Sequence, residues 1–411
     1  MRKVLKGNFI FTRIFGEYEI YRDFYLAIEN GKIVDFFKFL PIKYKNWELI
    51  EYKDKMIIPS FMDIHLHGAQ FENIGLGMDL PLLPWLETYT FPEENKFASN
   101  DYAEKVYDKF VKDLIYHGTT RACVFGTIHE SSKILFDKFI EYGIGGYIGK
   151  VNMNRNCPEY LQEKNSYEET LNFLDYTINK SDMVKPIITP RFIPSCTNEL
   201  MEKLGKLAEE KKLLVQSHLS ENKDEIKWVK ELQPDTSYTG AYQKYNMLGE
   251  KNISIMAHCV HISDAELPLM QNENFYVAHC PTSNFALKSG LAGIRRFLDN
   301  NINVGIGTDV SGGYTLSMRQ CIVAAVETSN LYDTYVEKSK PLSMCEAFYL
   351  GTKGGGKIFG NVGSFEVGYE FDALVIDDNS TLPLEKRLEK FIFDGKNEDI
   401  IEVYAKGVQI K

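Results

Sequence analysis

The sequence has no hydrophobic run near the roughly 18 residues that a membrane-spanning helix needs. Its first residues, MRKVLKGNFIF, include basic side chains but lack the unbroken apolar segment of a secretion signal. Seven cysteines are scattered over the chain and never form a Cys-x-x-Cys pair. An odd, dispersed set of this kind is typical of reduced thiols and argues against a disulfide framework or a zinc ribbon. We therefore expect a cytoplasmic protein that does not associate with a membrane.

The sequence also has fewer basic than acidic residues. The 47 lysines and arginines are outnumbered by 57 acidic residues, which gives a formal net charge of -10 and a pI near 5.5. Proteins that bind a phosphate backbone usually carry a basic patch or a domain pI above about 9. The charge balance therefore argues against a nucleic-acid polymer as a partner.

Several common catalytic motifs are missing. The chain has no P-loop, no GxGxxG and no His-Glu-x-x-His, and it lacks the His-x-Glu and Pro-Cys-x-x-Cys pair of one class of zinc deaminases. These absences exclude the corresponding nucleotide-binding and metal sites. They leave a chain of 411 residues, 44% of them hydrophobic, which is long enough to bury a large core.

What the sequence does contain is a repeated alternation of strand-like and helix-like segments. Residues 102–117, for example, place their apolar side chains on one helical face and end before Gly118. Eight short runs rich in β-branched residues begin at Met56, Thr119, Gly145, Lys185, Leu213, Ile253, Phe275 and Ile302. Eight strands that alternate with helices predict an α/β fold of the TIM type, a (β/α)8 barrel.

The two ends of the chain have a different pattern. Asn30-Gly31 stands between alternating apolar positions, which is a strong signal for a β-hairpin. Strand-like segments return from Phe371 and from Ile400. We predict a small β-sandwich domain made of residues 1–56 and 362–411, with the barrel, residues 57–361, inserted between its halves.

One connection, residues 68–101, breaks the alternation. It carries glycines and prolines among many apolar side chains, including Trp85. Connections longer than about 12 to 15 residues without secondary structure are uncommon unless they are functional or disordered, and this one is too apolar to be disordered. It is either a lid over the site or a structural segment that packs against the rest of the protein or forms an oligomer contact.

Several of the eight histidines lie at the ends of predicted strands. His65 and His67 are two residues apart at the end of the first barrel strand, so both side chains point to the same side. His218 ends the fifth run, His258 the sixth, and Asp309 the eighth. Barrel enzymes keep their catalytic groups at this end of the strands. Three neutral imidazoles and a carboxylate around an open position suit Zn²⁺, although each residue taken singly also fits a hydrogen-bonded structural role.

Glu221 follows His218 by three residues and is a candidate proton carrier between water and a substrate nitrogen. It is equally well placed as an acidic residue at a helix start. The end of the fourth run reads Thr189-Pro190-Arg191-Phe192, without the lysine that would bridge two metals, so one metal is expected. His279 ends the seventh run, and we expect it to support the pocket.

With these residues assembled, the chain resembles the amidohydrolase superfamily and, within it, the guanine deaminases. The resemblance covers nearly the whole chain. It rests on these segments: PSFMDIHLHGAQFENIG, PWLETYTFPEE, NRNCPEY, TPRFIPSC, QSHLSEN, AHC, AHCPTSN and GIGTDVSGG. Departures from the family pattern are Pro59-Ser60, Gly68-Ala69 and Asn154, and none of them removes a ligand.

The resemblance implies roles for individual residues. The implied zinc ligands, with Fe²⁺ as an alternative metal and one ion per subunit, are His65, His67, His218 and Asp309. The implied catalytic residues are Glu221 as proton shuttle, with His258 and Asp309 at the attacking water. The implied substrate-binding residues are Gln70, Trp85, Arg191, Phe192, His218, Glu221 and His258.

The activity implied by the resemblance is hydrolytic deamination of guanine, in a homodimer. Arg191 would donate to the purine carbonyl, with a structural ion pair as its alternative role. Two other interpretations stay open at this point. One is a deaminase or hydrolase of another heterocycle, such as 8-oxoguanine, a pterin or a triazine. The other is a non-catalytic scaffold, which the intact ligand set disfavours.

Overall fold

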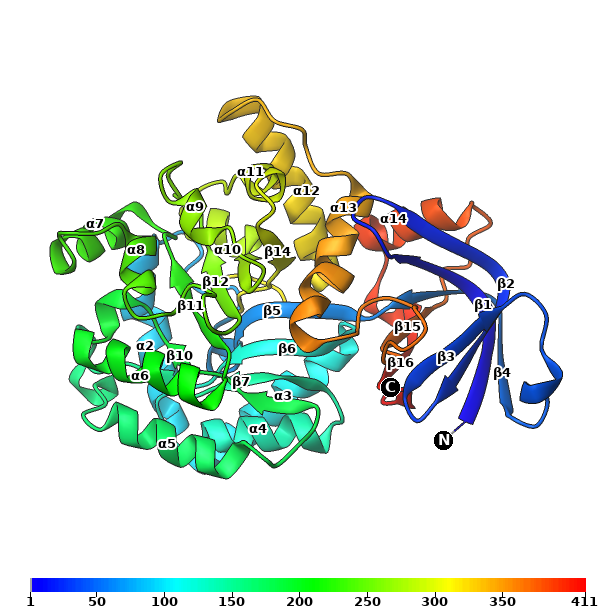
Figure 1. Ribbon diagram of the computed structural model, residues 1–411, viewed down its shortest axis with the longest axis horizontal. Helices are drawn as coiled ribbons and strands as arrows, with labels where there is room; N and C mark the ends of the chain where they lie inside the picture. Colours follow the sequence, from blue (N-terminus) through cyan, green and yellow to red (C-terminus); the bar gives the residue numbers. More distant parts are fainter. Residues whose placement is uncertain (1) are drawn as a thin grey trace.

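Short parallel strands lie at the centre of the larger part of the molecule in the computed structural model, which describes residues 2–411 (Figure 1). They form two four-stranded sheets. The strands of the first are β5 (Phe61–His67), β6 (Thr119–Phe125), β7 (Gly145–Gly149) and β9 (Val184–Pro186). Those of the second are β11 (Val215–Leu219), β12 (Ser254–His258), β13 (Phe275–His279) and β14 (Asn303–Ile306). Each of the eight predicted runs contains or overlaps one of these strands, which confirms them.

Backbone hydrogen bonds join the two parallel sheets at both seams. On one side, Ile188 N donates to Leu214 O at 2.9 Å. On the other, Asp309 N donates to His65 O and His67 N to Val310 O, both at 2.9 Å. The strands therefore follow one another in chain order around one core, and the seam beside β5 brings His65, His67 and Asp309 together.

The fourth run is the least regular. It is divided into β9 and β10 (Thr189–Pro190), and β10 pairs with β8 (Val151–Asn152) outside the main sheets. Pro186 and Pro190 have no backbone N–H to donate, so a continuous ladder cannot form here. This interruption leaves the residues after Pro190 free to turn toward the centre of the ring of strands.

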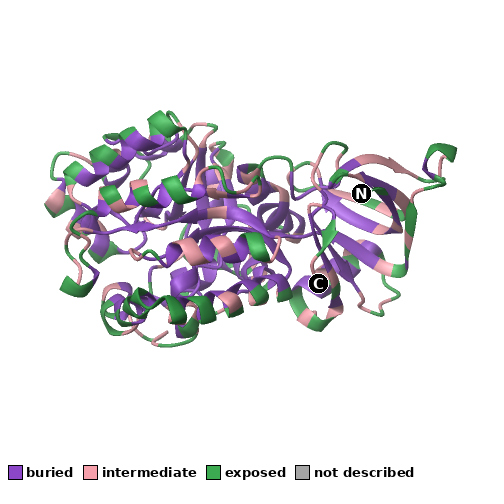
Figure 2. Ribbon diagram, turned by 90° about the horizontal axis from the view of Figure 1, so that it is seen from below, coloured by how far each residue is buried: buried purple, intermediate pink, exposed green. Residues whose placement is uncertain are grey.

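Helices cover the outside of the parallel strands (Figures 1 and 2). The longer ones are α3 (Asn100–Tyr116), α4 (Ser132–Glu141), α5 (Ser166–Thr177), α6 (Asn198–Lys211), α7 (Lys223–Leu232) and α12 (Met318–Tyr335). The shorter ones are α8 (Tyr238–Gln243), α9 (Leu267–Met270), α10 (Pro281–Ala286), α11 (Ile294–Asp299) and α13 (Met344–Tyr349). Figure 2 shows buried residues along the strands and exposed residues on the outer helix faces, so the core lies between the two layers.

The two ends of the chain meet in one mixed seven-stranded sheet, ordered β17-β16-β15-β4-β1-β2-β3. Its strands are β1 (Arg2–Thr12), β2 (Tyr18–Glu29), β3 (Lys32–Phe37), β4 (Glu48–Pro59), β15 (Ala373–Ile376), β16 (Ile400–Ala405) and β17 (Val408–Gln409). The predicted hairpin is confirmed: Asn30 and Gly31 connect β2 to β3 with φ of 51° and 80°. An additional helix, α14 (Leu384–Asp394), lies between β15 and β16.

The sheet curls around its own apolar cluster. Ile33 N donates to Tyr369 O and Gly368 N donates to Ile33 O, both at 2.8 Å, so β3 contacts the segment that leads into β15. Phe9 packs against Phe36 and Phe365 inside the curl, with ring centroids 5.2 and 5.7 Å away. A single curved sheet therefore stands where two packed sheets were predicted. The register shift in β1 between residues 7 and 9 gives the strand the irregularity that such bending needs.

Residues 68–101 are mostly short helical turns, with an irregular stretch only at residues 74–81, although the lack of periodicity suggested an irregular loop throughout. The turns are η2 (Gly68–Asn73), α1 (Leu82–Trp85), η3 (Leu86–Thr90), α2 (Phe91–Asn95) and η4 (Lys96–Ala98). Pro92 sits in the first turn of α2, where a missing N–H costs no helical hydrogen bond. Each turn is too short to display a helical period in the sequence. We call residues 82–95, which span α1, η3 and α2, the roof segment.

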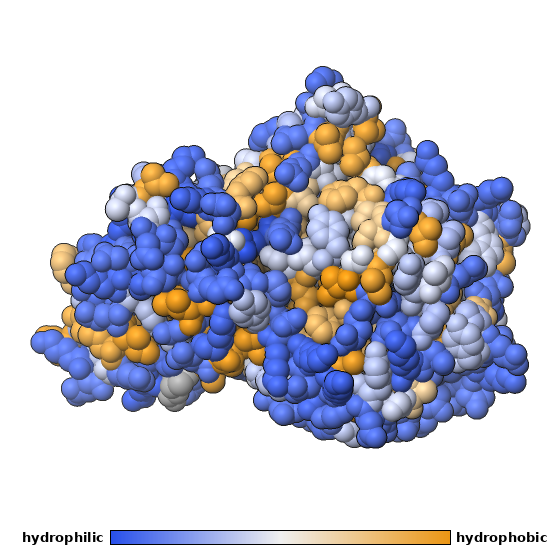
Figure 3. Space-filling view, turned by 180° about the vertical axis from the view of Figure 1, so that it is seen from behind, coloured by the Kyte–Doolittle hydropathy of each residue, from blue (hydrophilic) through white to orange (hydrophobic). Residues whose placement is uncertain are grey.

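The surface is mixed in polarity. On the face shown in Figure 3, hydrophobic residues form separate groups among hydrophilic ones. Within residues 2–411 no helix has both the length and the hydrophobicity to cross a membrane.

Candidate active site

The candidate site lies at the carboxyl ends of the parallel strands. β5 supplies His65 and His67, β11 supplies His218, and β12 supplies His258. Asp309 follows β14 by three residues. All five side chains are buried. Because these strands are parallel and adjacent, residues far apart in sequence meet at one end of the ring.

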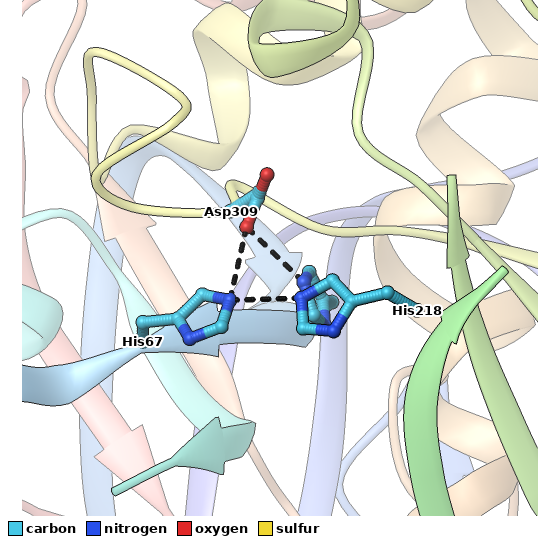
Figure 4. A group of neighbouring side chains, drawn as sticks. His67, His218 and Asp309 are labelled. Atoms are coloured by element: carbon cyan, nitrogen blue, oxygen red, sulfur yellow. Dashed lines mark hydrogen bonds and ion pairs between the residues drawn. The ribbon is translucent and has the colours of Figure 1, made fainter. Parts of the chain in front are cut away.

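Four of the predicted ligands form a compact group. Candidate ligand atoms of His65, His67, His218 and Asp309 all lie within 4.8 Å of one another. Asp309 Oδ1 is 3.1 Å from His65 Nε2 and 3.4 Å from His67 Nε2. His67 Nε2 lies 3.1 Å from His218 Nε2, and these contacts converge on one point (Figure 4). The structure thus brings together all four residues that the sequence suggested as metal ligands.

The chemistry of this group suits a divalent metal. Burial lowers the pKa of His67 to about 4 and that of His218 well below its ordinary value, so both rings are neutral. Burial alone would raise the pKa of Asp309, but the neighbouring His65 and His258 hold it well below its usual range. The Nε2 atom of His65 is buried and makes no well-aligned hydrogen bond within residues 2–411, although Asp309 Oδ1 lies 3.1 Å away. Neutral imidazoles and a charged carboxylate that face one another are a donor set for zinc or a similar ion.

Backbone and carboxylate partners hold the ligands in place. His218 Nδ1 donates to Arg191 O at 2.6 Å, which leaves its Nε2 facing the group. Asp63 accepts hydrogen bonds from the backbone N of His65 at 3.2 Å and of Thr308 at 3.1 Å. Asp63 therefore ties β5 to the loop that carries Asp309. Such outer contacts orient metal ligands.

Glu221 and His258 lie beside the ligand group. Glu221 Oε2 is 3.4 Å from His258 Nε2, and Ser289 Oγ donates to Glu221 Oε1 at 3.0 Å. Burial, helped by the nearby charge of Asp309, raises the pKa of Glu221 to about 8. A carboxyl group with a pKa near neutrality both accepts and releases a proton readily.

Two residues of the site have an unusual backbone conformation. His258 and Asp309 have φ of 72° and 50°, in the left-handed region that residues other than glycine rarely adopt. His258 Nδ1 donates to Asn284 Oδ1 at 2.9 Å, so its Nε2 faces Glu221 and Asp309. Strained residues of this kind are found where the position of a side chain matters for function.

A pocket opens onto these groups. The roof segment contributes Leu82, Trp85 and Leu86 to it. The other lining residues are His67, Gln70, Arg191, Phe192, His218, Glu221, Glu225, His258, Leu287, Asp309 and Gly312. The structure therefore brings all the sequence-predicted substrate-binding residues to one cavity, and His67, His218 and Asp309 of the ligand group also line it.

The polar residues under the roof are connected by one carboxylate. Glu94 Oε2 accepts from Arg191 Nη1 at 2.7 Å, and Glu94 Oε1 accepts from Gln70 Nε2 at 2.9 Å. All three residues are at most 3% exposed. Arg191 also lies over the ring of Phe91, 5.2 Å from its centroid. Arg191 is therefore in an ion pair and at the same time lines the pocket.

Comparison with known proteins assigns the chain to a family. The Amidohydrolase family model matches residues 56–410. The chain belongs to the amidohydrolase family.

Similar amidohydrolases are known from distant organisms. A guanine deaminase from Dictyostelium discoideum is 41% identical and the match covers 100% of this chain and 98% of that protein. One from Mus musculus is 38% identical over 99% of this chain and 96% of its own length. A crystal structure of guanine deaminase from C. acetobutylicum with bound guanine is 46% identical, covers 100% of both chains and superimposes with a TM-score of 0.98.

Sequence reasoning missed several residues of this amidohydrolase site. Glu225 lines the pocket and accepts from the backbone N of Glu221 at 3.0 Å and of Asn222 at 3.1 Å. The capping-box spacing of Asn222 and Glu225 was a signal for a helix start, although not for a pocket. Glu94 belongs to the segment PWLETYTFPEE, which the resemblance included without giving Glu94 a role.

His279 lies near the amidohydrolase site but outside the ligand group. It is fully buried at the end of β13, and neither ring nitrogen has a hydrogen-bond partner within residues 2–411. Burial lowers its pKa to about 3, so the ring is neutral. Its expected role as support for the pocket stays a prediction.

Proposed function

We propose that this protein is a guanine deaminase, which hydrolyses guanine to xanthine and ammonia. The observation that carries the proposal is one pocket that is lined by three of the four candidate metal ligands, by a carboxyl group whose pKa is raised to about 8, and by a buried arginine. The full-length similarity to guanine deaminases supports it.

The proposed cofactor is one zinc ion per subunit, with ferrous iron as the alternative. His65, His67, His218 and Asp309 would hold it. When bound, zinc lowers the pKa of water toward about 7 and so supplies a nucleophile at neutral pH. The neutral rings and the charged carboxylate described above support this assignment.

The proposed guanine contacts come from the polar and aromatic side chains of the pocket. Arg191 would donate an N–H to the purine carbonyl oxygen, and Gln70 would pair with the ring edge. Phe192 and Trp85 would pack against the base from the sides of the pocket. Adenine has no carbonyl at this position, and a buried donor without an acceptor is costly.

Proton transfer would fall to Glu221. It would accept a proton from the attacking water and deliver it to ring nitrogen N3. It would then take the proton of the new hydroxyl group on C2 and pass it to the exocyclic amino group, so that the bond from C2 to this amino nitrogen breaks, a carbonyl forms at C2 and ammonia leaves. His258 and Asp309 would orient the water, because His258 Nε2 lies 3.4 Å from Glu221 Oε2 and 3.8 Å from Asp309 Oδ2. Guanine and one water thereby give xanthine and one ammonia.

The proposal extends to the architecture. We propose that the parallel strands of residues 57–361 form one (β/α)8 barrel and that residues 1–56 and 362–411 form a separate small domain, although β4 continues to Pro59. We also propose a homodimer that works in the reducing cytoplasm, where the seven unpaired cysteines would be stable. Sedimentation velocity tests the dimer.

The experiment that tests the function is ammonia release across a panel of heterocycles, with metal content measured on the same sample. The panel contains guanine, adenine, 8-oxoguanine, a pterin and a triazine. We expect turnover of guanine and a kcat/KM for adenine lower by about 10⁴-fold. Equal turnover of adenine, or metal-loaded protein that acts only on another member of the panel, would contradict the proposal. Metal-loaded protein without any activity would favour the scaffold.

A further inference from the structure

Two adjacent buried glutamates in α2, Glu93 and Glu94, make contacts in different directions. They are 4% and 3% exposed. Glu93 accepts hydrogen bonds from Lys96 and Tyr102, whereas Glu94 accepts from Gln70 and Arg191, which line the pocket. Of these two glutamates, Glu94 is therefore the one that contacts side chains that would meet the substrate.

We infer that Glu94 is a positioning residue that fixes Gln70 and Arg191 and, by neutralising Arg191, makes the pocket select an uncharged base. The inference deepens the proposed function and rests on it for the identity of the substrate. Within residues 2–411, Glu94 is the only carboxylate in an ion pair with Arg191. A buried arginine without a counter-ion strongly favours an anionic partner. With Glu94 present, that preference is already satisfied by the protein.

Glu94 also determines which way the amide of Gln70 points. Gln70 Nε2 donates to Glu94, and Gln70 Oε1 accepts from Ser311 N at 3.3 Å. An amide with a partner for its nitrogen and another for its oxygen has one favoured orientation. The carboxylate thus sets which donor and acceptor atoms Gln70 offers to a ring edge.

Replacing Glu94 with glutamine tests the positioning role while it preserves the size of the side chain. Gln70 and Arg191 donate to different oxygens of Glu94. In E94Q one of these oxygens is replaced by an NH2 group, which cannot accept, so one of the two hydrogen bonds is lost. We expect the KM for guanine to rise about 10-fold or more, as for the loss of a hydrogen bond to a charged group. The kcat should change less than about 3-fold and the metal content should equal that of the wild type, because Glu94 touches neither the ligands nor Glu221.

A charged ligand tests the neutralisation separately. The probe is purine-6-carboxylate, and its binding to metal-loaded wild type and E94Q is measured by titration calorimetry. Freed from its carboxylate, Arg191 would pair with the carboxylate of the probe. We expect E94Q to bind the probe about 10-fold more tightly than the wild type does. E94D retains the charge and should show no such gain.

Glu93 provides the matched control in the same helix. It accepts hydrogen bonds from Lys96 and Tyr102, and neither of these partners lines the pocket. E93Q should therefore lower the thermal stability of the protein but leave the KM for guanine and the affinity for the probe unchanged. It separates distortion of the helix from the loss of the Glu94 bridge.

Each outcome is decisive. An E94Q protein with wild-type KM, or one that loses guanine and the anionic probe equally, would overturn the inference. Wild-type protein that fails to turn over guanine in the same assay would instead overturn the proposed function. The comparison of probe affinities needs no turnover, so it tests the role of Glu94 in either case.

Discussion

The two ends of the pocket are built in different ways. The metal-ligand end is built from side chains at the ends of hydrogen-bonded parallel strands, where Asp309 N donates directly to His65 O. The roof end is built from short helical turns, and its link to the strands includes the side-chain bridge of Glu94. We conclude that backbone hydrogen bonds fix the positions of the candidate metal ligands, whereas side-chain contacts position the residues that would select the bound base.

The strongest test of this contrast is to remove the metal-ligand end. Replacing His67 with alanine deletes one of the four candidate ligands. We expect metal content to fall to background and deaminase activity with it. A chelator applied to the wild type should have the same effect, and added zinc should restore activity. Full activity in metal-free protein would contradict the assignment.

A smaller but still large effect is expected at the proton carrier. Glu221→Gln keeps the shape of the side chain but cannot exchange a proton. We expect kcat to fall about 10² to 10⁴-fold, which is the usual contribution of a general acid–base group. Metal content, measured by atomic emission, should not change. An enzyme that keeps its kcat would remove Glu221 from the mechanism.

At the roof end, Arg191→Lys should have an intermediate effect. Lysine keeps the charge but loses the planar fork that serves Glu94 and the ligand together. We expect kcat/KM for guanine to fall about 10 to 100-fold, at unchanged metal content. If the loss equalled that of the Glu221 variant, the two ends of the pocket would not be separable.

The smallest effect concerns stability and comes from Glu225. Burial and the neighbouring Glu221 raise its pKa from 4.5 to about 7. At a pH between these two pKa values the folded protein binds more protons than the unfolded chain, so the free energy of unfolding falls as pH rises. This decrease in the free energy of unfolding should reach about 3 kcal/mol at most. Urea unfolding between pH 5 and 8 should show a weaker pH dependence for Glu225→Gln, and equal slopes would contradict the buried titration.

The metal-ligand end was predictable from sequence because its signals are local. His65 and His67 share the end of one strand, and His218 and Asp309 each end a recognisable run. Parallel strands in chain order bring such residues together without further information. The family resemblance then pointed to Gln70, Arg191 and Phe192, for which local pattern alone gave no role.

The roof end was harder to predict because its signals are long-range. Glu94 and Arg191 are 97 residues apart and meet only in the folded protein. The turns of the roof segment hold five residues or fewer each, too few to establish a helical period. The curl of the terminal sheet was missed for a similar reason, since β3 contacts residues 368–371 across most of the chain.

The arrangement of the terminal sheet has a consequence for biosynthesis. β4 lies between β1, made early, and β15, which begins at Ala373. On the ribosome, β1 to β4 emerge long before β15, so one edge of β4 stays open while residues 60–361 are made. Open strand edges promote association between nascent chains. Early folding of the parallel strands would therefore have to take place beside an unfinished sheet, which closes only when the last forty or so residues arrive.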